Sequence, residues 1–323
     1  MSSPLRVIFM GTPEFAVASL DILVQNGYQI VAVITAPDRP SGRGLELAMS
    51  EVKKYSVSKN LPVLQPDKLR NETFLAQLRA LNADLQVVVA FRMLPELVWN
   101  MPRLGTINLH GSLLPQYRGA APINRAVMNG ETETGVSTFF LQQEVDTGKI
   151  IFQQRTPIGP DETAGEIHDR LMAIGAGLVL KTVQAIEQGS YPQLDQQELI
   201  GDPEPLKQAP KIFKEDCRIC WSDSPLQIHN FVRGLSPYPA AITDLVSPEG
   251  KQYPLKIFKT SFENNTHSTP AGQVETLNKE QVRIAVPGGY IIPLELQLAG
   301  KRRMTIPEFL RGFQLNGNWK VAL

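Results

Sequence analysis

The first 190 residues alternate short apolar runs with stretches in which apolar residues recur at the spacing of a helix. The run at 87–91 is apolar throughout, which is typical of a strand covered on both faces, and the apolar residues between Phe15 and Leu23 follow a helical period. This alternation predicts a doubly wound, mostly parallel α/β sheet. We expect strands at residues 5–10, 28–35, 85–91, 105–110 and 135–141, and helices near 48–60, 72–81 and 163–188.

The sequence changes character after residue 189. Pro and Gln become frequent through 191–205, where neither a helix nor a strand is favoured. Beyond this stretch, a helical pattern at 224–234 precedes five short strand-like runs separated by turn residues, which indicates a small β-barrel. The five runs are 241–246, 253–260, 271–277, 282–285 and 290–298. We therefore predict an α/β domain at 1–189, a linker at 190–206 and a barrel domain at 207–323.

The formal charge of the chain is zero, from 32 Lys+Arg and 32 Asp+Glu. This sum hides an asymmetry, because residues 1–206 carry 17 basic and 22 acidic side chains, a net of −5, whereas 207–323 carry 15 and 10, a net of +5. Basic side chains gain affinity for a polyanion by displacing its counterions, so the C-terminal part favours an anionic partner. An ordinary solvated surface explains the same charge equally well.

Nothing in the sequence predicts a membrane segment or a secretory signal. No run approaches the ~20 consecutive apolar residues of a spanning helix. The short apolar run near the N-terminus has no small-residue cleavage site after it. We therefore expect a cytoplasmic protein.

The two cysteines, Cys217 and Cys220, have the C-x-x-C spacing of some redox and metal sites. Their segment is interpreted as a strand of period two, which sends the two side chains to opposite faces. The sequence has no second C-x-x-C pair and no nearby pair of His to complete four zinc ligands. We interpret both as structural or incidental cysteines and expect no metal.

Polar residues end the strand expected at 105–110. Asn108 and His110 are two residues apart, so they share one face of that strand. Ligands bind outside the carboxyl ends of strands in open parallel sheets. An amide that donates to a developing oxyanion, beside an imidazole that exchanges a proton, suits acyl transfer. The alternative is that both side chains only satisfy backbone groups of the following turn.

A carboxylate on a tight loop adds to this candidate site. Asp146 is followed by Thr147 and Gly148 between two apolar runs, and it can orient and charge-stabilise a His. An Asx-turn between two strands is the alternative, because Asp-Thr-Gly suits such a turn. The triplet also occurs in aspartic proteases, but the chain has no second copy to supply the carboxylate pair that they need.

Other motifs of catalysis are missing from the sequence. It has neither the G-x-G-x-x-G of dinucleotide-binding proteins nor the phosphate-binding loop of NTPases. It has no G-x-S-x-G elbow either, so Ser112 is not an obvious nucleophile. We interpret His168, His229 and His267 as structural or surface residues, because their spacing forms no metal-ligand cluster.

The loop at 36–44 contains Arg39 and Arg43 among Pro and Gly residues. Two guanidinium groups on an accessible loop can reach an anionic ligand. The loop follows the strand expected to end near residue 35, which places it at the same edge of the sheet as His110. A solvated loop without a ligand is the alternative.

Four stretches together resemble the methionyl-tRNA formyltransferase family, and the resemblance covers nearly the whole chain. The stretch at 108–123, NLHGSLLPQYRGAAPI, is highly specific, and it is joined by stretches at 9–16, 37–44 and 146–148. The resemblance implies a Rossmann-like formyltransferase domain and an OB-like β-barrel. It also implies a reaction in translation initiation, in which a formyl group moves from the co-substrate 10-formyltetrahydrofolate to the α-amino group of methionine on initiator tRNA.

The resemblance implies roles for individual residues. In the catalytic trio, Asn108 and His110 stabilise the oxyanion at the formyl carbon, while Asp146 holds His110 and helps to pass a proton from the amine to the folate nitrogen. The residues implied on the folate side are Ser112, Leu113, Leu114, Pro115, Phe91 and Arg92.

The expected partners are initiator Met-tRNA and folate, with no membrane, and we expect a monomer. The resemblance places Arg43 on the loop that engages the tRNA acceptor stem. Two departures from the family matter here. Arg92 stands where many members have Gly, so it can alter the pocket wall near folate, and 45–48 is LELA where several relatives carry Lys. The tRNA contact then falls more to the other cations, and the candidates are Arg39, Arg43, Lys301, Arg302 and Arg303.

Two alternatives stay open. A formyltransferase of the same fold can act on a small amine, such as glycinamide ribonucleotide or an amino sugar, but that substrate needs neither the loop at 37–44 nor a basic C-terminal domain. A nucleic-acid-binding protein with a degenerate α/β domain keeps Asn108 and His110 as relics. It binds tRNA and transfers no formyl group.

Overall fold

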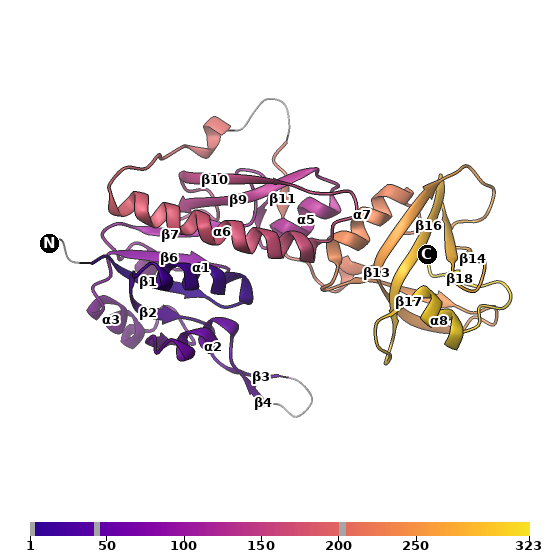
Figure 1. Cartoon of the computed structure of the whole chain (residues 1–323), viewed down its shortest axis with the longest axis horizontal. Helices are drawn as coiled ribbons and strands as arrows, with labels where there is room; N and C mark the ends of the chain where they lie inside the picture. Colours follow the sequence, from indigo (N-terminus) through magenta and orange to yellow (C-terminus); the bar gives the residue numbers. More distant parts are fainter. Residues whose placement is uncertain (1–3, 42–45, 200–204) are drawn as a thin grey trace. The chain divides into compact units, whose positions relative to one another are not determined.

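The computed structural model describes residues 4–41, 46–199 and 205–323. It divides into two compact units (Figure 1). Unit 1 comprises the described residues of 1–122, 134–156 and 168–208, and unit 2 comprises those of 123–133, 157–167 and 209–323. Two short segments of the predicted α/β domain thus group with the C-terminal residues. The predicted domain and linker boundaries stay predictions.

Helices and strands alternate through unit 1 and give way to a run of strands in unit 2. In chain order the elements are β1 (Arg6–Gly11), α1 (Glu14–Gln25), β2 (Gln29–Ile34), β3 (Arg39–Ser41), β4 (Glu46–Ala48), α2 (Glu51–Ser58), β5 (Val63–Leu64), α3 (Glu72–Ala80), β6 (Leu85–Val89), α4 (Glu96–Trp99), β7 (Thr106–His110), β8 (Arg118–Gly119), α5 (Pro122–Met128), β9 (Glu133–Phe140), β10 (Ile150–Pro157), α6 (Ala164–Glu187), η1 (Gln196–Leu199), β11 (Gln208–Ala209), η2 (Glu215–Cys217), α7 (Pro225–Leu235), β12 (Ala241–Val246), β13 (Gln252–Asn264), β14 (Val274–Thr276), β15 (Val282–Val286), β16 (Gly289–Leu298), β17 (Met304–Thr305), α8 (Ile306–Gly312) and β18 (Lys320–Val321).

The sheet of unit 1 has the order β10-β9-β7-β6-β1-β2-β5. The pairs β1–β2, β2–β5, β1–β6 and β6–β7 are parallel, and β9 joins β7 in the antiparallel sense. The predicted mostly parallel sheet is therefore confirmed. The chain moves outward from β1 to β5 and then returns to β6 on the other side of β1. The strand order thus reverses between β1 and β6, beside the carboxyl end of β7, where open sheets of this kind bind ligands.

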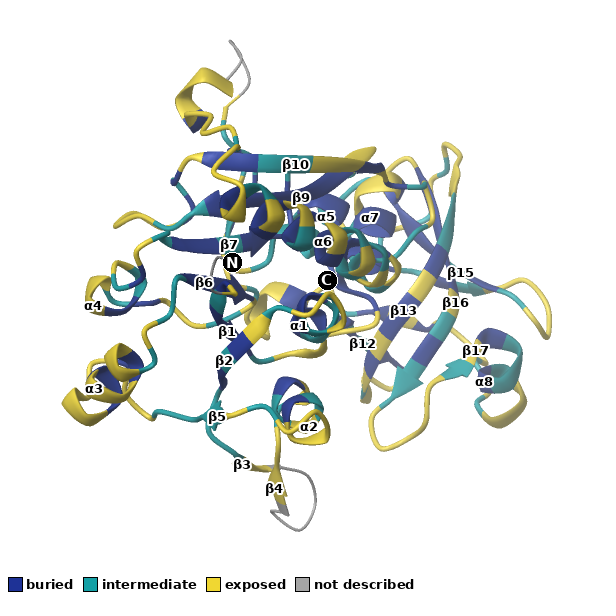
Figure 2. Ribbon diagram, turned by 60° about the vertical axis from the view of Figure 1, so that its left-hand side comes forward, coloured by how far each residue is buried: buried dark blue, intermediate teal, exposed yellow. Residues whose placement is uncertain are grey.

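Helices cover both faces of this sheet, and Figure 2 shows β6 and β7 buried between them. On one face, apolar side chains of α3 and α4 pack against those of β1, β2 and β6. On the other face α6 approaches β7 closely. A Cβ on Gly175 of α6 would lie only 2.7 Å from the Leu109 side chain, so glycine permits this packing. Covering both faces explains why these strands are continuous apolar runs.

The strands of unit 2 form an antiparallel sheet in the order β14-β15-β16-β13-β12-β18, with β17 also paired to β16. An antiparallel bridge between Gln273 and Lys320 brings the two ends of this order together, so the sheet is nearly closed. Closure removes the unpaired edges that an open sheet leaves. All five predicted strands are present, and the OB-like near-barrel is confirmed.

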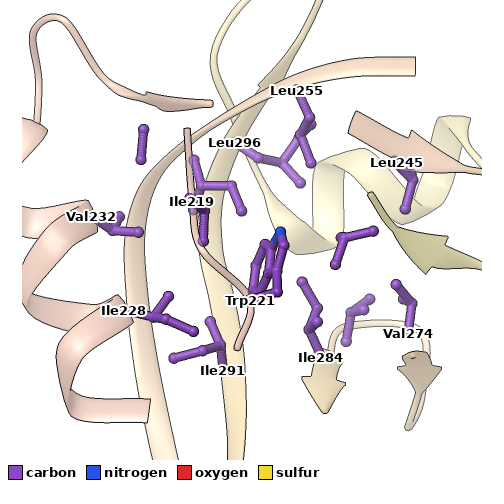
Figure 3. Packing of buried hydrophobic residues seen from close by; sticks show 14 of the residues in the cluster. Ile219, Trp221, Ile228, Val232, Leu245, Leu255, Val274, Ile284, Ile291 and Leu296 are labelled. Atoms are coloured by element: carbon purple, nitrogen blue, oxygen red, sulfur yellow. The ribbon is translucent and has the colours of Figure 1, made fainter. Parts of the chain in front are cut away.

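Trp221 fills the centre of unit 2 (Figure 3). Its side chain is 1% exposed, and its indole N–H donates to the Thr243 hydroxyl at 2.9 Å. Ile219 and Ile228 lie around it. A buried Trp needs such an acceptor, because an unpaired indole N–H would lose its hydration on folding without replacement.

The prediction of a strand around the two cysteines is wrong. Residues 215–217 form a short 3-10 helix, and only Arg218 makes an isolated bridge, to Ile242. Cys217 is buried and Cys220 is exposed. In the described ranges no group of three or more His, Cys, Asp or Glu is placed to hold a metal ion. Within the same part of the chain, no helix is long and apolar enough to cross a membrane.

Candidate active site

Asn108 and His110 lie on the same face of β7. Asn108 is paired with Val88 of β6, which belongs to the apolar cluster under α3 and α4. His110 is paired with Ser137 of β9. The alternation of a strand puts both polar side chains on this face, while Leu109 points to α6. The site therefore begins at the carboxyl end of β7, next to the reversal in strand order.

His110 is held in one orientation. Its side chain is almost fully buried, and its Nε2 lies 2.8 Å from the Tyr117 carbonyl oxygen. Because a carbonyl oxygen only accepts, Nε2 carries the hydrogen and donates it. The other nitrogen, Nδ1, lies 3.8 Å from Oδ2 of Asp146. In this tautomer the lone pair of the imidazole lies on Nδ1, beside the Asp146 carboxylate.

Asp146 is fixed by long-range contacts. Its Oδ2 accepts the Gly119 backbone N–H at 3.0 Å, so its carboxylate is bound to a residue far along the chain, in contrast to the Asx-turn alternative. The Asp146 backbone has φ 55°, a left-handed conformation that is uncommon for a residue with a Cβ. A Cβ on Gly148 would meet the Phe140 carbonyl oxygen at 1.6 Å. The loop can take this path only with glycine at 148.

The Asn108 amide is half-buried and free for a ligand. In the part of the chain that the structure describes, its side chain has no hydrogen-bond partner. A half-buried amide of this kind can donate to a bound oxygen without first breaking a contact inside the protein. The alternative in which Asn108 only satisfies the following turn has no support from these contacts.

The turn after β7 is tied to the strands beside it. The Ser137 hydroxyl donates to the Ser112 carbonyl at 2.7 Å and accepts the Leu114 N–H at 3.0 Å. The Gln153 amide donates to that same hydroxyl and to the Leu114 carbonyl, at 2.8 Å each. Leu114 and Pro115 are buried, Leu113 is half-buried, and the Ser112 hydroxyl donates to the Gln116 carbonyl. The Ser112 hydroxyl is thus already engaged, and the turn is rigid.

Sequence reasoning missed Ser137 and Gln153. Ser137 lies on β9 and Gln153 lies on β10, and the sequences of these two strands carry no motif. Their contacts with the turn cross up to 39 residues of sequence, and only the sheet topology brings them together. No local signal in the sequence identifies them.

Arg92 follows β6 and binds the neighbouring backbone. Its guanidinium donates to the Asp67 carbonyl at 2.8 Å and to the Pro66 carbonyl, and it lies over the Phe91 ring at 5.5 Å. Partial burial lowers the pKa of Arg92, and the nearby Arg39 lowers it further, while Asp67 opposes this. Arg92 thus joins two loops at the carboxyl ends of the strands.

The predicted RNA-binding cations differ in their availability. Arg39 is exposed on β3, whereas Arg43 lies outside the described residues. Arg302 pairs with Glu308 at 2.8 Å. Arg303 donates to Glu295 at 2.6 Å and lies over the Phe258 ring. Of the three consecutive cations, only the Lys301 ammonium has no partner among the residues that the structure places.

Two known family models match this chain. The family model described as "Formyl transferase" matches residues 5–183, and the model described as "Formyl transferase, C-terminal domain" matches residues 211–314. The chain therefore belongs to the formyl transferase family, and it is an enzyme.

Curated relatives with high sequence identity share one name within this family. The chain is 54% identical over 319 residues to a methionyl-tRNA formyltransferase of Bacteroides thetaiotaomicron, with 98% of each chain covered. It is 56% identical, with the same coverage, to that of Parabacteroides distasonis. The protein of the same name from Flavobacterium johnsoniae is 49% identical and covers 98% of this chain and 99% of its own. The resemblance inferred from the motifs is confirmed.

Solved structures show the same fold at lower identity. A sugar 3N-formyl transferase, solved in the presence of dTDP and 5-N-formyl-THF, has a TM-score of 0.63 at 20% identity, and the match covers 93% of this chain and 100% of that chain. The HypX protein of Aquifex aeolicus, in complex with tetrahydrofolic acid, has a TM-score of 0.62 at 18% identity, with 96% of this chain and 48% of that chain covered. At these sequence identities, the structural match shows only that the fold is shared.

Proposed function

We propose that this protein transfers the formyl group of 10-formyltetrahydrofolate to the α-amino group of methionine on initiator Met-tRNA. The observation that carries the proposal is the convergence of Asn108, His110 and Asp146 at the carboxyl end of β7, in a chain of the formyl transferase family. The names of relatives that share about half of its residues over nearly its full length support the choice of acceptor.

The reaction needs no nucleophile from the protein. When bound, the folate co-substrate supplies the electrophilic formyl carbon, and the uncharged methionyl amine attacks it. A carbon–nitrogen bond forms to the amine and another breaks at the folate nitrogen, so one proton must leave the first nitrogen and one must reach the second. The free Asn108 amide donates to the oxygen on which negative charge develops. His110 Nδ1, facing Asp146, handles the proton.

The rigid turn fits a folate at this place. Ser112, Leu113, Leu114 and Pro115 lead away from His110 and are fixed by Ser137. A turn fixed in this way offers backbone groups in set positions to the polar ring of a ligand. Phe91 and Arg92 contribute the neighbouring wall at the carboxyl end of β6.

We assign the tRNA contact to the exposed cations. Arg39 lies on β3, Arg43 is four residues further along the sequence, and Lys301, Arg302 and Arg303 belong to the turn between β16 and β17. Lys301 contributes most within this turn, since Arg302 and Arg303 are engaged by Glu308 and Glu295. We further propose that the protein acts in the cytoplasm, as a monomer and without a metal.

A direct assay tests the function. The protein is mixed with 10-formyltetrahydrofolate and charged initiator Met-tRNA, and formylmethionine is measured, with elongator Met-tRNA as the control. We expect formylation of the initiator and little of the elongator. An acceptor of another kind is indicated if a small amine, such as glycinamide ribonucleotide or an amino sugar, is formylated and the initiator is not. Binding of tRNA without any formyl transfer would indicate a non-catalytic RNA-binding protein.

A further inference from the structure

The segment after α6 is attached to the sheet of unit 1 by specific contacts. Leu194 and Ile150 of β10 exchange two backbone hydrogen bonds of 2.9 Å each. The Tyr191 ring lies 5.6 Å from the Phe140 ring. Figure 1 shows this segment leaving α6 and running back above β10. Its sequence, rich in Pro and Gln, predicted only a linker.

One side chain of this segment is buried. Gln196 is 1% exposed, whereas its neighbours Asp195 and Gln197 are exposed. The Gln196 Nε2 donates to the backbone carbonyls of Asp146 and Gly148, at 2.8 Å each. Its Oε1 accepts from Nε and Nη2 of Arg118, at 3.0 and 2.6 Å.

These four hydrogen bonds use the whole capacity of an amide. Both hydrogens of the Gln196 nitrogen and both lone pairs of its oxygen are engaged. A carboxylate of the same shape would turn an oxygen toward two carbonyl oxygens, and an apolar side chain would leave them without a donor. The surroundings of this residue are therefore complementary to a glutamine.

The partners of Gln196 are the groups that hold the catalytic carboxylate. On one side it binds the backbone of Asp146 itself, which has the unfavourable φ of 55°. On the other side it binds Arg118, whose neighbour Gly119 donates its N–H to the Asp146 carboxylate. The Gln196 amide thus connects the Asp146 backbone with the Arg118–Gly119 segment, and these two parts hold the carboxylate that faces His110.

We propose that Gln196 is a positioning residue for formyl transfer, which acts by fixing the Asp146 carboxylate relative to Nδ1 of His110. This inference rests on the proposed function. Gln196 touches neither substrate, so its loss lowers the rate of the chemical step and leaves the affinity for both substrates nearly unchanged. Misplacement of a catalytic group by about 1 Å costs on the order of a hundredfold in rate.

The first test compares Gln196→Glu and Gln196→Ala with the matched control Gln197→Glu, whose side chain is exposed. Steady-state kinetics with initiator Met-tRNA are expected to show kcat lower by roughly tenfold to a hundredfold in both Gln196 variants, with each KM within about threefold of the parent. The control is expected to match the parent. Unchanged kcat in both Gln196 variants, or a raised KM at unchanged kcat, overturns the inference.

A second measurement does not depend on activity. Hydrogen–deuterium exchange of the peptide that covers residues 144–149 is expected to be faster in Gln196→Glu than in the parent, and unchanged in Gln197→Glu. If the Gln196 variants do not fold, Arg118→Met removes the other end of the contact and should give the same loss of kcat at constant KM. A parent protein that formylates nothing contradicts the proposed function, whereas equal exchange of the loop in Gln196→Glu and parent contradicts the role of Gln196.

Discussion

The end of β7 in unit 1 and the turn at 301–303 in unit 2 place charged and polar groups in opposite settings. His110 and Asp146 are at least nine-tenths buried, and each has a fixed partner in the backbone. Arg302 and Arg303 are exposed, and each is paired with a nearby carboxylate. Catalysis of bond formation needs catalytic groups at fixed distances from the reacting atoms, whereas attraction of a polyanion needs only positive charge on the surface of the protein. Substitutions should therefore have large effects at the first place and small ones at the second.

Removal of the free amide should give the largest effect. Asn108→Ala is expected to lower the turnover of Met-tRNA formylation by on the order of a hundredfold or more, because a donor to the developing oxyanion is lost. The measurement is steady-state kinetics, with thermal unfolding as the control for folding. A variant that keeps near-normal turnover would show that the amide does not stabilise the transition state, and the contrast between the two regions would lose its basis.

A substitution in the loop that carries Asp146 tests whether the distance between Asp146 and His110 matters for catalysis. Gly148→Ala places a Cβ against the Phe140 carbonyl, so the loop must shift and carry Asp146 away from His110. We expect a loss of kcat of roughly tenfold to a hundredfold. Gly177→Ala on α6 is the matched control, since a Cβ there meets nothing within 4 Å. Equal activity of the two alanine variants would mean that the loop geometry is not essential.

The turn after β7 should show an intermediate effect. Ser137→Ala removes the hydroxyl that binds Ser112, Leu114 and Gln153, and leaves buried polar groups unpaired. We expect a loss of about 1–3 kcal/mol in the free energy of unfolding. Chemical denaturation measures this loss, and a KM for 10-formyltetrahydrofolate raised several-fold at nearly constant kcat would accompany it. A lower kcat with unchanged KM would place Ser137 with the catalytic groups instead of the folate turn.

The basic turn of unit 2 should show the smallest effects. Lys301→Ala is expected to reduce the slope of log affinity for tRNA against log salt by about 1, as for the loss of one phosphate contact. Glu308→Gln should strengthen binding, since it releases Arg302 and keeps a side chain that can cap α8. Filter binding at several salt concentrations measures both. Weaker binding in Glu308→Gln would mean that the Arg302–Glu308 pair itself is recognised.

Much of the fold could be predicted from the sequence, because the pattern of apolar residues directly reflects burial. The run at 87–91 predicted a strand covered on both faces, and β6 ends only two residues earlier. The short strands β17 and β18 were missed, since each of them is determined by its pairing with another strand rather than by local periodicity. The short helix α8 was also missed, although Thr305 and Glu308 form a capping box at its start. The segment of Cys217 alternates in sequence like a strand, but it contributes only one bridge.

The candidate site, like the fold, could be predicted from the sequence only in part. Asn108 and His110 could be predicted because two polar residues at the end of an apolar strand are a local signal. The partners that fix Asp146 could not be predicted, since Gly119 is 27 residues from Asp146 and Gln196 is 50 residues from it. The pairing of Arg302 with Glu308 was equally invisible in a count of charges. Sequence gives the identity of the reacting groups, and tertiary contacts determine their geometry and availability.

We infer that His110, positioned by Tyr117 and facing Asp146, handles the proton in formyl transfer to initiator Met-tRNA. Single-turnover formylation with both substrates saturating, compared between the parent and His110→Ala, tests it most directly, because binding and product release do not enter the measured rate. We expect a rate at least about a hundredfold lower in His110→Ala, with tRNA binding unchanged. A variant that formylates initiator Met-tRNA at nearly the parent rate would contradict it.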